Sequence, residues 1–179
     1  KAVADVSGIV YADTGLDIDK LLSWVSESGG VADYPNAEPI SHDELFALDV
    51  DVLIPAALHA QITAENVESI RAPIIVEAAN GPITADAATV LDHGGVHVIP
   101  DILANAGGVV VSYYEWVQNK TSNRWSADDV DTRLRNQIWD ACDRVSAQRA
   151  QRACSRRAAA YIEASELLQK VYSLRGIFP

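Results

Sequence analysis

The chain lacks several features that mark common classes of protein. It has no methionine, four lysines and two cysteines among its 179 residues. Cys142 and Cys154 lie in helix-like sequence without a CxxC pair, and the four histidines show no metal-ligand spacing. We therefore expect free thiols and no bound metal. No apolar run approaches the roughly 20 residues that span a bilayer, so we also expect no membrane segment.

Positive charge is scarce as well. Aspartate and glutamate number 25 against 14 lysines and arginines, which gives a net charge of -11 at pH 7. So acidic a protein is a poor partner for nucleic acids and anionic membranes. A lysine-poor, acidic surface suits high salt, where self-repulsion is screened, but an ordinary acidic cytoplasmic protein explains the composition equally well. We expect a cytoplasmic protein on either interpretation.

Four short apolar runs, at residues 2–4, 51–55, 73–79 and 96–100, alternate with segments of helical periodicity. Continuous apolar strands of this kind are typical of a parallel sheet covered on both faces. The intervening helical patterns are at 15–30, 42–48, 63–70 (with Thr63 as its cap) and 84–95. Three longer helical patterns follow Pro100. We predict an α/β fold, a doubly wound parallel sheet followed by C-terminal helices.

The chain does not begin with a methionine. It opens in the strand-like stretch at 2–4 without a methionine, so we expect further sequence before Lys1 and a sheet that is incomplete at its N-terminus. The predicted domains are a partial ligand-binding domain over 1–105 and C-terminal helices over 106–179.

Small residues gather where the predicted strands end. In an open parallel sheet, ligands bind beyond the carboxyl ends of the strands. Asp5, PAAL (55–58), AANGP (78–82) and PDILANAGG (100–108) all fall there. Either the backbone approaches a flat cofactor and its phosphates, or tight turns require small side chains. Four such stretches at one edge favour the cofactor.

Asp5 has two interpretations of its own. A carboxylate at the end of the second strand of a dinucleotide fold binds the adenosine ribose hydroxyls. Alternatively, Asp5 is a polar residue that begins a turn. The glycine fingerprint that would decide for the ribose is absent from the chain.

Gly107 and Gly108 lie at the start of a predicted helix, where each costs about 1 kcal/mol relative to alanine. Asn105, Gly108, Val109 and Ser112 follow an i, i+3, i+4, i+7 spacing and therefore share one helix face. That face could fix a small polar ligand against a cofactor. Alternatively, the helix packs closely on the sheet through its glycines, with Asn105 as a cap.

Four segments carry a family resemblance: DVLIPAALHAQIT, EAANGPIT, VIPDILANAGGVVVSYYEWVQN and RRAAAYIEASELLQKVYSLRG. Together they resemble the dinucleotide-binding domain of glutamate dehydrogenase, within the Glu/Leu/Phe/Val dehydrogenase family. The similarity runs from Ala2 to Gly176. The leucine and phenylalanine enzymes share NAGG but lack VSYYEW, so glutamate is favoured. This chain departs from the family in having Ala78 where glycine is usual, and in the many arginines of residues 147–157.

The resemblance implies a Rossmann-like fold, NAD or NADP as the cofactor, and a homo-oligomer, usually a hexamer. The implied reaction is the oxidative deamination of L-glutamate to 2-oxoglutarate and ammonium. The residues implied are Asp5, Ala56, Ala57, Asn80 and Asn105 for the cofactor, and Val109 and Ser112 for glutamate. A carboxylate repels a 2′-phosphate, so Asp5 favours NAD.

The family's glycine fingerprint, catalytic lysine and catalytic aspartate would precede Lys1, so we expect no catalytic residue in this chain and no activity from it alone. The helices from residue 106 would then pack against the missing domain, near a hinge. Two alternatives remain: a dehydrogenase of leucine, phenylalanine or valine, and a non-catalytic dinucleotide-binding module.

Overall fold

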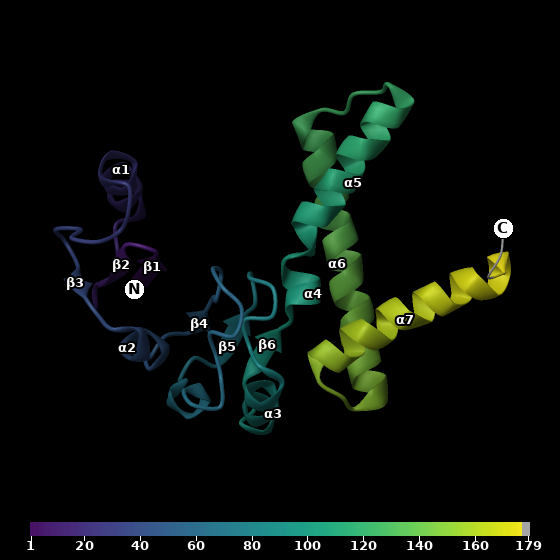
Figure 1. The fold of residues 1–179 in the computed structure, drawn as a ribbon. Helices are drawn as coiled ribbons and strands as arrows, with labels where there is room; N and C mark the ends of the chain where they lie inside the picture. The colour runs from purple at the N-terminus through teal and green to yellow at the C-terminus, as the bar shows by residue number, and fades with distance from the viewer. Residues whose placement is uncertain (177–179) are drawn as a thin grey trace. The chain divides into compact units, whose positions relative to one another are not determined.

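The computed structural model describes residues 1–176 (Figure 1). The chain forms two compact units. Unit 1 consists of Lys1–Leu53, Ala60–Ile74 and Ile83–Val96. Unit 2 consists of Ile54–His59, Ile75–Pro82 and His97–Pro179. The predicted domains, 1–105 and 106–179, stay predictions, and residues 177–179 of the second lie outside the described part of the chain.

Unit 1 begins with an antiparallel sheet. Its strands are β1 (Ala2–Asp5), β2 (Gly8–Tyr11) and β3 (Glu38–Pro39), in the order β1-β2-β3. The prediction that residues 2–4 belong to the parallel sheet is therefore wrong. A second apolar run, β2, follows after only two residues, and so short a connection permits antiparallel pairing, whereas a parallel neighbour needs a crossover of a dozen or more residues.

Helix α1 (Ile18–Ser28) covers this sheet with an apolar stripe. Asp17 caps its start by accepting a hydrogen bond from the Lys20 amide, and Gly29 ends it in the left-handed conformation, with φ of 86°. Leu21 and Val10 belong to a core cluster whose other buried members are Val31 and Tyr34. The helix predicted at 15–30 is thus confirmed.

The remaining elements of unit 1 are short. The helix predicted at 42–48 is confirmed as α2 (His42–Phe46), where Ser41 and Glu44 form a capping box. The helix predicted at 63–70 is wrong, because only the 3-10 turn η1 (Val67–Ser69) forms. The Asn66 side chain explains the difference: it accepts from the Thr63 amide at 2.8 Å and donates to the Gln61 carbonyl at 2.8 Å, which competes with helical hydrogen bonds.

The other predicted strands form a three-stranded parallel sheet in the order β4-β5-β6. Its strands are β4 (Val52–Leu53), β5 (Ile74–Val76) and β6 (His97–Ile99). Helix α3 (Ala85–His93) lies between β5 and β6 in the chain, as predicted. The α/β class and the parallel sheet are therefore confirmed.

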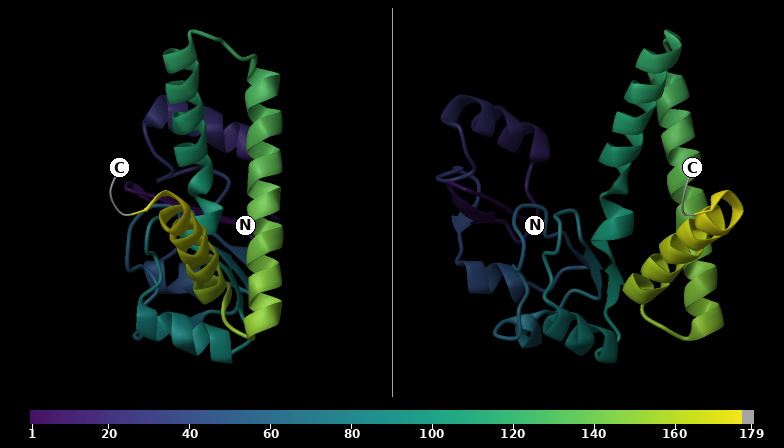
Figure 2. Two further views of the ribbon diagram at one scale, coloured as in Figure 1. Left: turned by 90° about the vertical axis from the view of Figure 1, so that its right-hand side faces the viewer. Right: turned by 45° about the vertical axis from the view of Figure 1, so that its right-hand side comes forward.

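The C-terminal helices belong to unit 2 (Figure 2). They are α4 (Asp101–Ala104), α5 (Ala106–Thr121), α6 (Ala127–Arg152) and α7 (Arg156–Arg175). Helix α5 lies alongside α6, where the Tyr114 hydroxyl donates to Gln137 Oε1 at 2.6 Å. Buried Leu103, Val145, Ala159 and Ala160 form the core between α4, α6 and α7.

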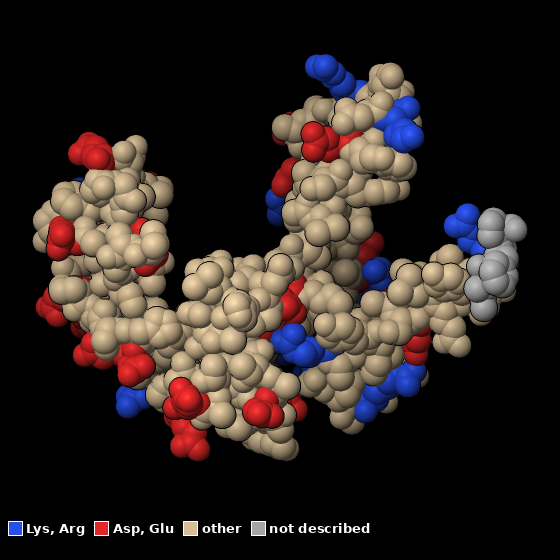
Figure 3. Space-filling model, viewed as in Figure 1, with Lys and Arg blue, Asp and Glu red and all other residues tan. Residues whose placement is uncertain are grey.

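Charge is distributed unevenly over the two units. On the face shown in Figure 3, acidic side chains predominate over unit 1, and basic side chains are seen mainly over the C-terminal helices. None of the helices in residues 1–176 is both long and apolar enough to cross a membrane. Cys142 and Cys154 are free thiols, half-buried against the core of unit 2.

Candidate functional site

Three of the four small-residue stretches predicted at the sheet edge meet in unit 2. The Pro55 carbonyl, at the start of the stretch 55–58, accepts hydrogen bonds from the amides of Ala78 and Ala79, at 3.1 and 3.0 Å. The Gly81 amide donates to Asp101 Oδ2 at 2.8 Å. Residues 55–58, 78–82 and 100–108 are therefore joined directly by hydrogen bonds.

Two of the predicted cofactor residues touch each other. Asn105 Nδ2 donates to Asn80 Oδ1 at 2.6 Å, across loops that follow different strands. Asn105 lies between α4 and α5, with φ of -102° and ψ of 6°, so the helix face predicted to run from Asn105 to Ser112 begins outside regular helix. Its side chain caps neither helix, and the Asn80 amide group and the Asn105 carbonyl oxygen take no part in the bond between the two side chains.

The other predicted site residues of unit 2 face away from the core. Val109 is 75% exposed, and the remainder are exposed as well. We refer to these residues as the open face: Ala56, Ala57, Asn80, Gly108, Val109 and Ser112.

The two glycines at the start of α5 are not required by packing within residues 1–176. A Cβ added at Gly107 would meet only Leu134 Cδ1, at 3.8 Å, which is an ordinary contact. A Cβ added at Gly108 would meet nothing within 4 Å. The alternative that α5 packs closely on the sheet through its glycines is therefore wrong for the described chain, and Gly108 remains open to a ligand.

Ser112 lies one turn after Gly108 on the same helix face. Its hydroxyl donates to the Gly108 carbonyl at 2.9 Å. A hydroxyl proton turns easily, so a bound carboxylate could replace that carbonyl as the acceptor. Gly108 and Ser112 thus offer bare backbone and a hydroxyl side by side.

Asp5 belongs to unit 1, whereas the other predicted site residues belong to unit 2. Its Oδ1 accepts from the Ser7 amide at 2.7 Å and from the Ser7 hydroxyl at 2.5 Å, and its Oδ2 accepts from the Val31 amide at 3.0 Å. The bond from the Ser7 hydroxyl, chiefly, holds the pKa of Asp5 below its ordinary value. Asp5 therefore begins a turn as an ionised carboxylate, and its role at a ribose stays a prediction.

The same loops carry a group of charges that was not predicted from the sequence as part of the site. Glu77, directly after β5, has a fully buried side chain. Arg157, near the start of α7, donates through Nη2 to both Glu77 oxygens, at 2.5 Å each, and through Nη1 to Asp101 Oδ1 at 3.0 Å. We call Glu77, Asp101 and Arg157 the supporting network.

Two signals in the sequence point to this network. A glutamate within the apolar run 73–79 has no place in a buried strand unless a cation meets it. The surplus of arginines in residues 147–157 had no explanation from sequence, and Arg157 is now explained by Glu77 and Asp101. Pairing these signals required the tertiary structure, because 80 residues separate the partners.

Ionisation in the network is mutually supported. Burial acts to raise the pKa of Asp101, but hydrogen bonds from the Gly81 and Ile102 amides and the charge of Arg157 outweigh it, so the pKa of Asp101 is lowered. Burial acts to lower the pKa of Arg157, and the bonds to Glu77 and Asp101 outweigh it, so the pKa is raised. Both groups are charged at neutral pH.

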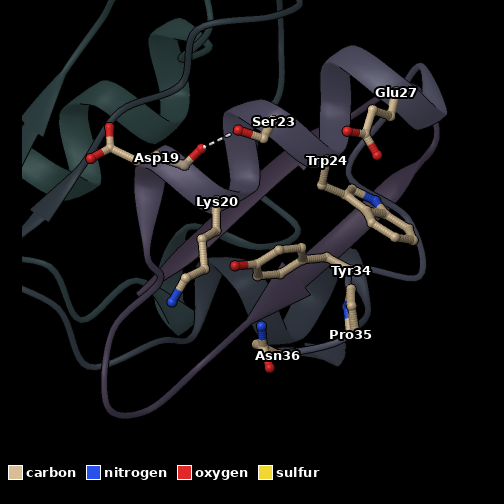
Figure 4. Close-up of a pocket in the computed structure, with 8 residues that line it drawn as sticks. All are labelled: Asp19, Lys20, Ser23, Trp24, Glu27, Tyr34, Pro35 and Asn36. Carbon is tan, nitrogen blue, oxygen red and sulfur yellow. Dashed lines mark hydrogen bonds between the residues drawn. The ribbon is translucent and has the colours of Figure 1, made fainter.

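A separate hollow of about 380 Å³ lies in unit 1, on α1 and the loop after it (Figure 4). Trp24, Tyr34 and Lys20 line it, and the Lys20 ammonium pairs with Asp17 at 2.8 Å. The hollow contains none of the residues predicted for the cofactor or the substrate. Within residues 1–176, no group of three or more histidine, cysteine or acidic side chains is arranged to hold a metal ion.

Comparison with known proteins gives the chain a family. A family model described as "Glutamate/Leucine/Phenylalanine/Valine dehydrogenase" matches residues 1–176. The chain is 47% identical to glutamate dehydrogenase A2 of Halobacterium salinarum, over 99% of this chain and 43% of that protein.

Two further relatives differ in their cofactor. An NADP-specific glutamate dehydrogenase A1 of Halobacterium salinarum is 43% identical, over 99% of this chain and 43% of the relative. An NAD-specific glutamate dehydrogenase of Staphylococcus aureus is 44% identical, over 89% of this chain and 38% of the relative. The chain thus spans about two-fifths of the length of the curated relatives it matches.

Among solved structures, a hetero-hexameric glutamate dehydrogenase from Thermus thermophilus, in a leucine-bound form, superimposes with a TM-score of 0.90. It is 30% identical, and the match covers 99% of this chain and 42% of that one. The likeness confirms the Rossmann-like fold predicted from the sequence. By the match of the family model over nearly its whole length, the chain belongs to the glutamate, leucine, phenylalanine and valine dehydrogenase family.

Proposed function

We propose that the chain is the dinucleotide-binding and C-terminal part of an NAD(P)-dependent glutamate dehydrogenase. The intact enzyme would convert L-glutamate to 2-oxoglutarate and ammonium by oxidative deamination. The relatives that cover nearly the whole chain are glutamate dehydrogenases by name, which supports glutamate within the family.

The observation that carries the proposal is the asparagine pair at the ends of the strands. Asn80 and Asn105 meet at 2.6 Å beside the exposed, small side chains of Ala56 and Ala57. A nicotinamide carboxamide has one donor group and one acceptor, and the Asn80 amide and the Asn105 carbonyl, which the pair does not use in its own bond, are complementary to both. The flat cofactor requires small neighbours, which this edge supplies. The residues present therefore fit a nicotinamide dinucleotide.

In this proposal Ala56, Ala57 and Asn80 line the dinucleotide, and Asn105 lies near its nicotinamide end. The nicotinamide, when bound, supplies the hydride chemistry. Ser112 would orient glutamate by donating its hydroxyl proton to the side-chain carboxylate, and Val109 would pack against the side-chain methylenes.

The choice between NAD and NADP rests on Asp5 in the proposal. Its ionised carboxylate would accept hydrogen bonds from ribose hydroxyls and repel a 2′-phosphate, which favours NAD. We also propose a cytoplasmic homo-oligomer, with the helices from residue 106 packing against the catalytic domain near a hinge. The hexamer is supported by the Thermus thermophilus structure, which is a hetero-hexamer by its description.

The first test is the mass of the native polypeptide. A chain well over twice 19.3 kDa would supply the catalytic half that the proposal requires. A native chain of 19.3 kDa would contradict the enzyme and favour a dinucleotide-binding module.

The second test is a substrate panel with the native protein, in which reduction of NAD and of NADP is followed by absorbance. We expect reduction with L-glutamate and little with leucine, phenylalanine or valine. A preference for leucine, phenylalanine or valine would contradict glutamate as the substrate, and the family assignment would still hold.

A further inference from the structure

Glu77 is the one charged side chain that is fully buried among residues 1–176. An ionised carboxylate taken out of water is expensive unless a cation and hydrogen-bond donors compensate it. Arg157 and the Asp101 amide supply that compensation, at 2.5 and 2.8 Å. Glu77 lies directly after β5, and the groups that compensate its charge therefore contact the loops that follow the strands.

Arg157 connects the residue that follows β5 to the first residue of α4. One end of its guanidinium meets Glu77, which precedes the loop 78–82, and the other meets Asp101, which opens α4. The planar fork of arginine can hold both carboxylates at once. The Arg157 side chain is 28% exposed, so part of it reaches solvent while its guanidinium holds the two carboxylates.

From Arg157, two hydrogen bonds and one peptide link in the chain lead to the asparagine pair. Asp101 Oδ1 accepts from Arg157, and its Oδ2 accepts from the Gly81 amide at 2.8 Å. Gly81 is the neighbour of Asn80 in the chain, and Asn80 accepts from Asn105 at 2.6 Å. Asn105 follows α4, the helix that Asp101 begins. Both asparagines are thus fixed by loops that Arg157 ties together.

A comparison within unit 2 separates this arrangement from an ordinary ion pair. Arg144 Nε donates to Glu163 Oε1 at 2.9 Å, which joins α6 to α7 with both side chains partly exposed. Within residues 1–176, that pair makes no hydrogen bond to the strand-end loops, whereas the Arg157 network makes three. Arg144 therefore serves as a control for loss of an arginine–carboxylate contact on these helices.

We propose that Arg157 is a positioning residue for the dinucleotide site, acting through Glu77 and Asp101 to set the separation of Asn80 and Asn105. The inference rests on the proposed function in one respect, namely that these asparagines bind the cofactor. Helix α7 would then influence cofactor affinity although Arg157 does not touch the ligand.

Arg157→Lys is the decisive variant. Lysine keeps the positive charge but is a point donor that cannot span both carboxylates. We expect the protein to fold and its dissociation constant for NADH, measured by fluorescence titration of the native protein, to rise about tenfold, since displacements of about 1 Å weaken positioned sites strongly. The KM for the dinucleotide should rise with it, while the KM for glutamate changes little. Arg144→Lys should leave all these values unchanged.

A second readout does not depend on cofactor binding. In NMR spectra, the Gly81 amide and the Asn105 side-chain amide should shift in Arg157→Lys and stay in place in Arg144→Lys. Asp101→Asn, which keeps the Arg157–Glu77 contact, should shift the same signals and weaken NADH binding with a smaller loss of thermal stability. This variant keeps the inference testable if Arg157→Lys does not fold.

The outcomes are separable. A lowered melting temperature with unchanged NADH affinity and unchanged Gly81 and Asn105 signals would overturn the inference and leave Arg157 a structural ion pair. Shifted signals in a protein whose unaltered form binds neither NADH nor NADPH would contradict the proposed function and support the connection from Arg157 to the asparagines.

Discussion

The supporting network and the open face of unit 2 involve the same loops but differ in burial and in how their polar groups are satisfied. In the network every carboxylate receives several donors, and Glu77 is fully buried. On the open face, Val109 is 75% exposed, and a Cβ at Gly108 would meet nothing. The difference indicates that residues with strong internal contacts hold the loops, while residues without them are free for a ligand. Substitutions in the network should reduce stability as well as cofactor binding, whereas those on the open face should reduce binding without a large loss of stability.

The largest expected effect is that of Arg157→Ala. Removing the cation leaves Glu77 buried without a countercharge, which costs about 3 kcal/mol of unfolding free energy. Urea denaturation followed by circular dichroism measures the loss. Arg144→Ala, which removes a partly exposed pair with Glu163, should cost less than about 1 kcal/mol. Equal losses of unfolding free energy in the two variants would show that the network stabilises the protein no more than an ordinary ion pair between helices does.

Asp101→Asn comes next and adds a pH dependence. The Asp101 carboxylate accepts hydrogen bonds from the Gly81 and Ile102 amides, and loss of its charge should lower the free energy of unfolding by about 1.5 kcal/mol at neutral pH. The pKa of Asp101 is lower in the folded state than in the unfolded state. Its contribution is therefore present above the unfolded pKa and is lost as the pH falls through the folded value.

Thermal melts between pH 7 and pH 3 check this expectation. The unaltered protein should lose stability below about pH 4, the ordinary range of aspartate, and the variant should lose less over the same interval. Asp131→Asn removes only an exposed pair with Arg135 and should leave the acid dependence as it is. An acid dependence that is identical in Asp101→Asn would show that other carboxylates dominate it.

Gly108→Ala should change stability and binding in opposite directions. Alanine in a helix is more stable than glycine by up to about 1 kcal/mol, and at this position the added methyl group meets nothing in the chain. If a ligand approaches the backbone here, its affinity should fall although the protein is more stable. Gly107→Ala is the matched control, since its methyl group would make only an ordinary contact with Leu134. It should stabilise the protein without weakening NADH or glutamate binding.

Ser112→Ala should have the smallest effect on stability, within about 0.5 kcal/mol, because the side chain is exposed and only back-bonds to Gly108. In the native enzyme the KM for glutamate should rise while the KM for the dinucleotide stays constant. Ser146→Ala, at an exposed position of α6, provides the comparison. Unchanged glutamate kinetics in Ser112→Ala would remove Ser112 from the substrate site and favour a different amino acid as the substrate.

Local patterns account for the elements that were predicted well. Ser41 and Ser126 cap their helices, and Gly29 ends α1, because these signals act between residues a few positions apart. The same reasoning failed at 63–70, where the Asn66 side chain bonds the backbone and leaves only a 3-10 turn. It also failed at β1, which pairs with the unrecognised strand β2 rather than with the parallel sheet.

Some parts of the candidate site also follow from local sequence rules, and others do not. Spacing along α5 placed Gly108 and Ser112 on one face, and their hydrogen bond is consistent with that spacing. The meeting of Asn80 with Asn105 required only the rule that parallel strands end at one edge. The partner of Glu77 lies 80 residues away, and no periodicity or spacing connects the two.

The sequence by itself determined the α/β class, the positions of most helices, the family resemblance and the stretches that line the open face. These follow from hydrophobic periodicity, capping and small-residue motifs, which are local properties of the chain. Only the tertiary structure decided that β1 is antiparallel, that Gly108 is open, and that Arg157 neutralises Glu77 and Asp101. The physical reason is that burial and charge compensation depend on which distant segments share a low-dielectric interior, and that is a property of the folded chain.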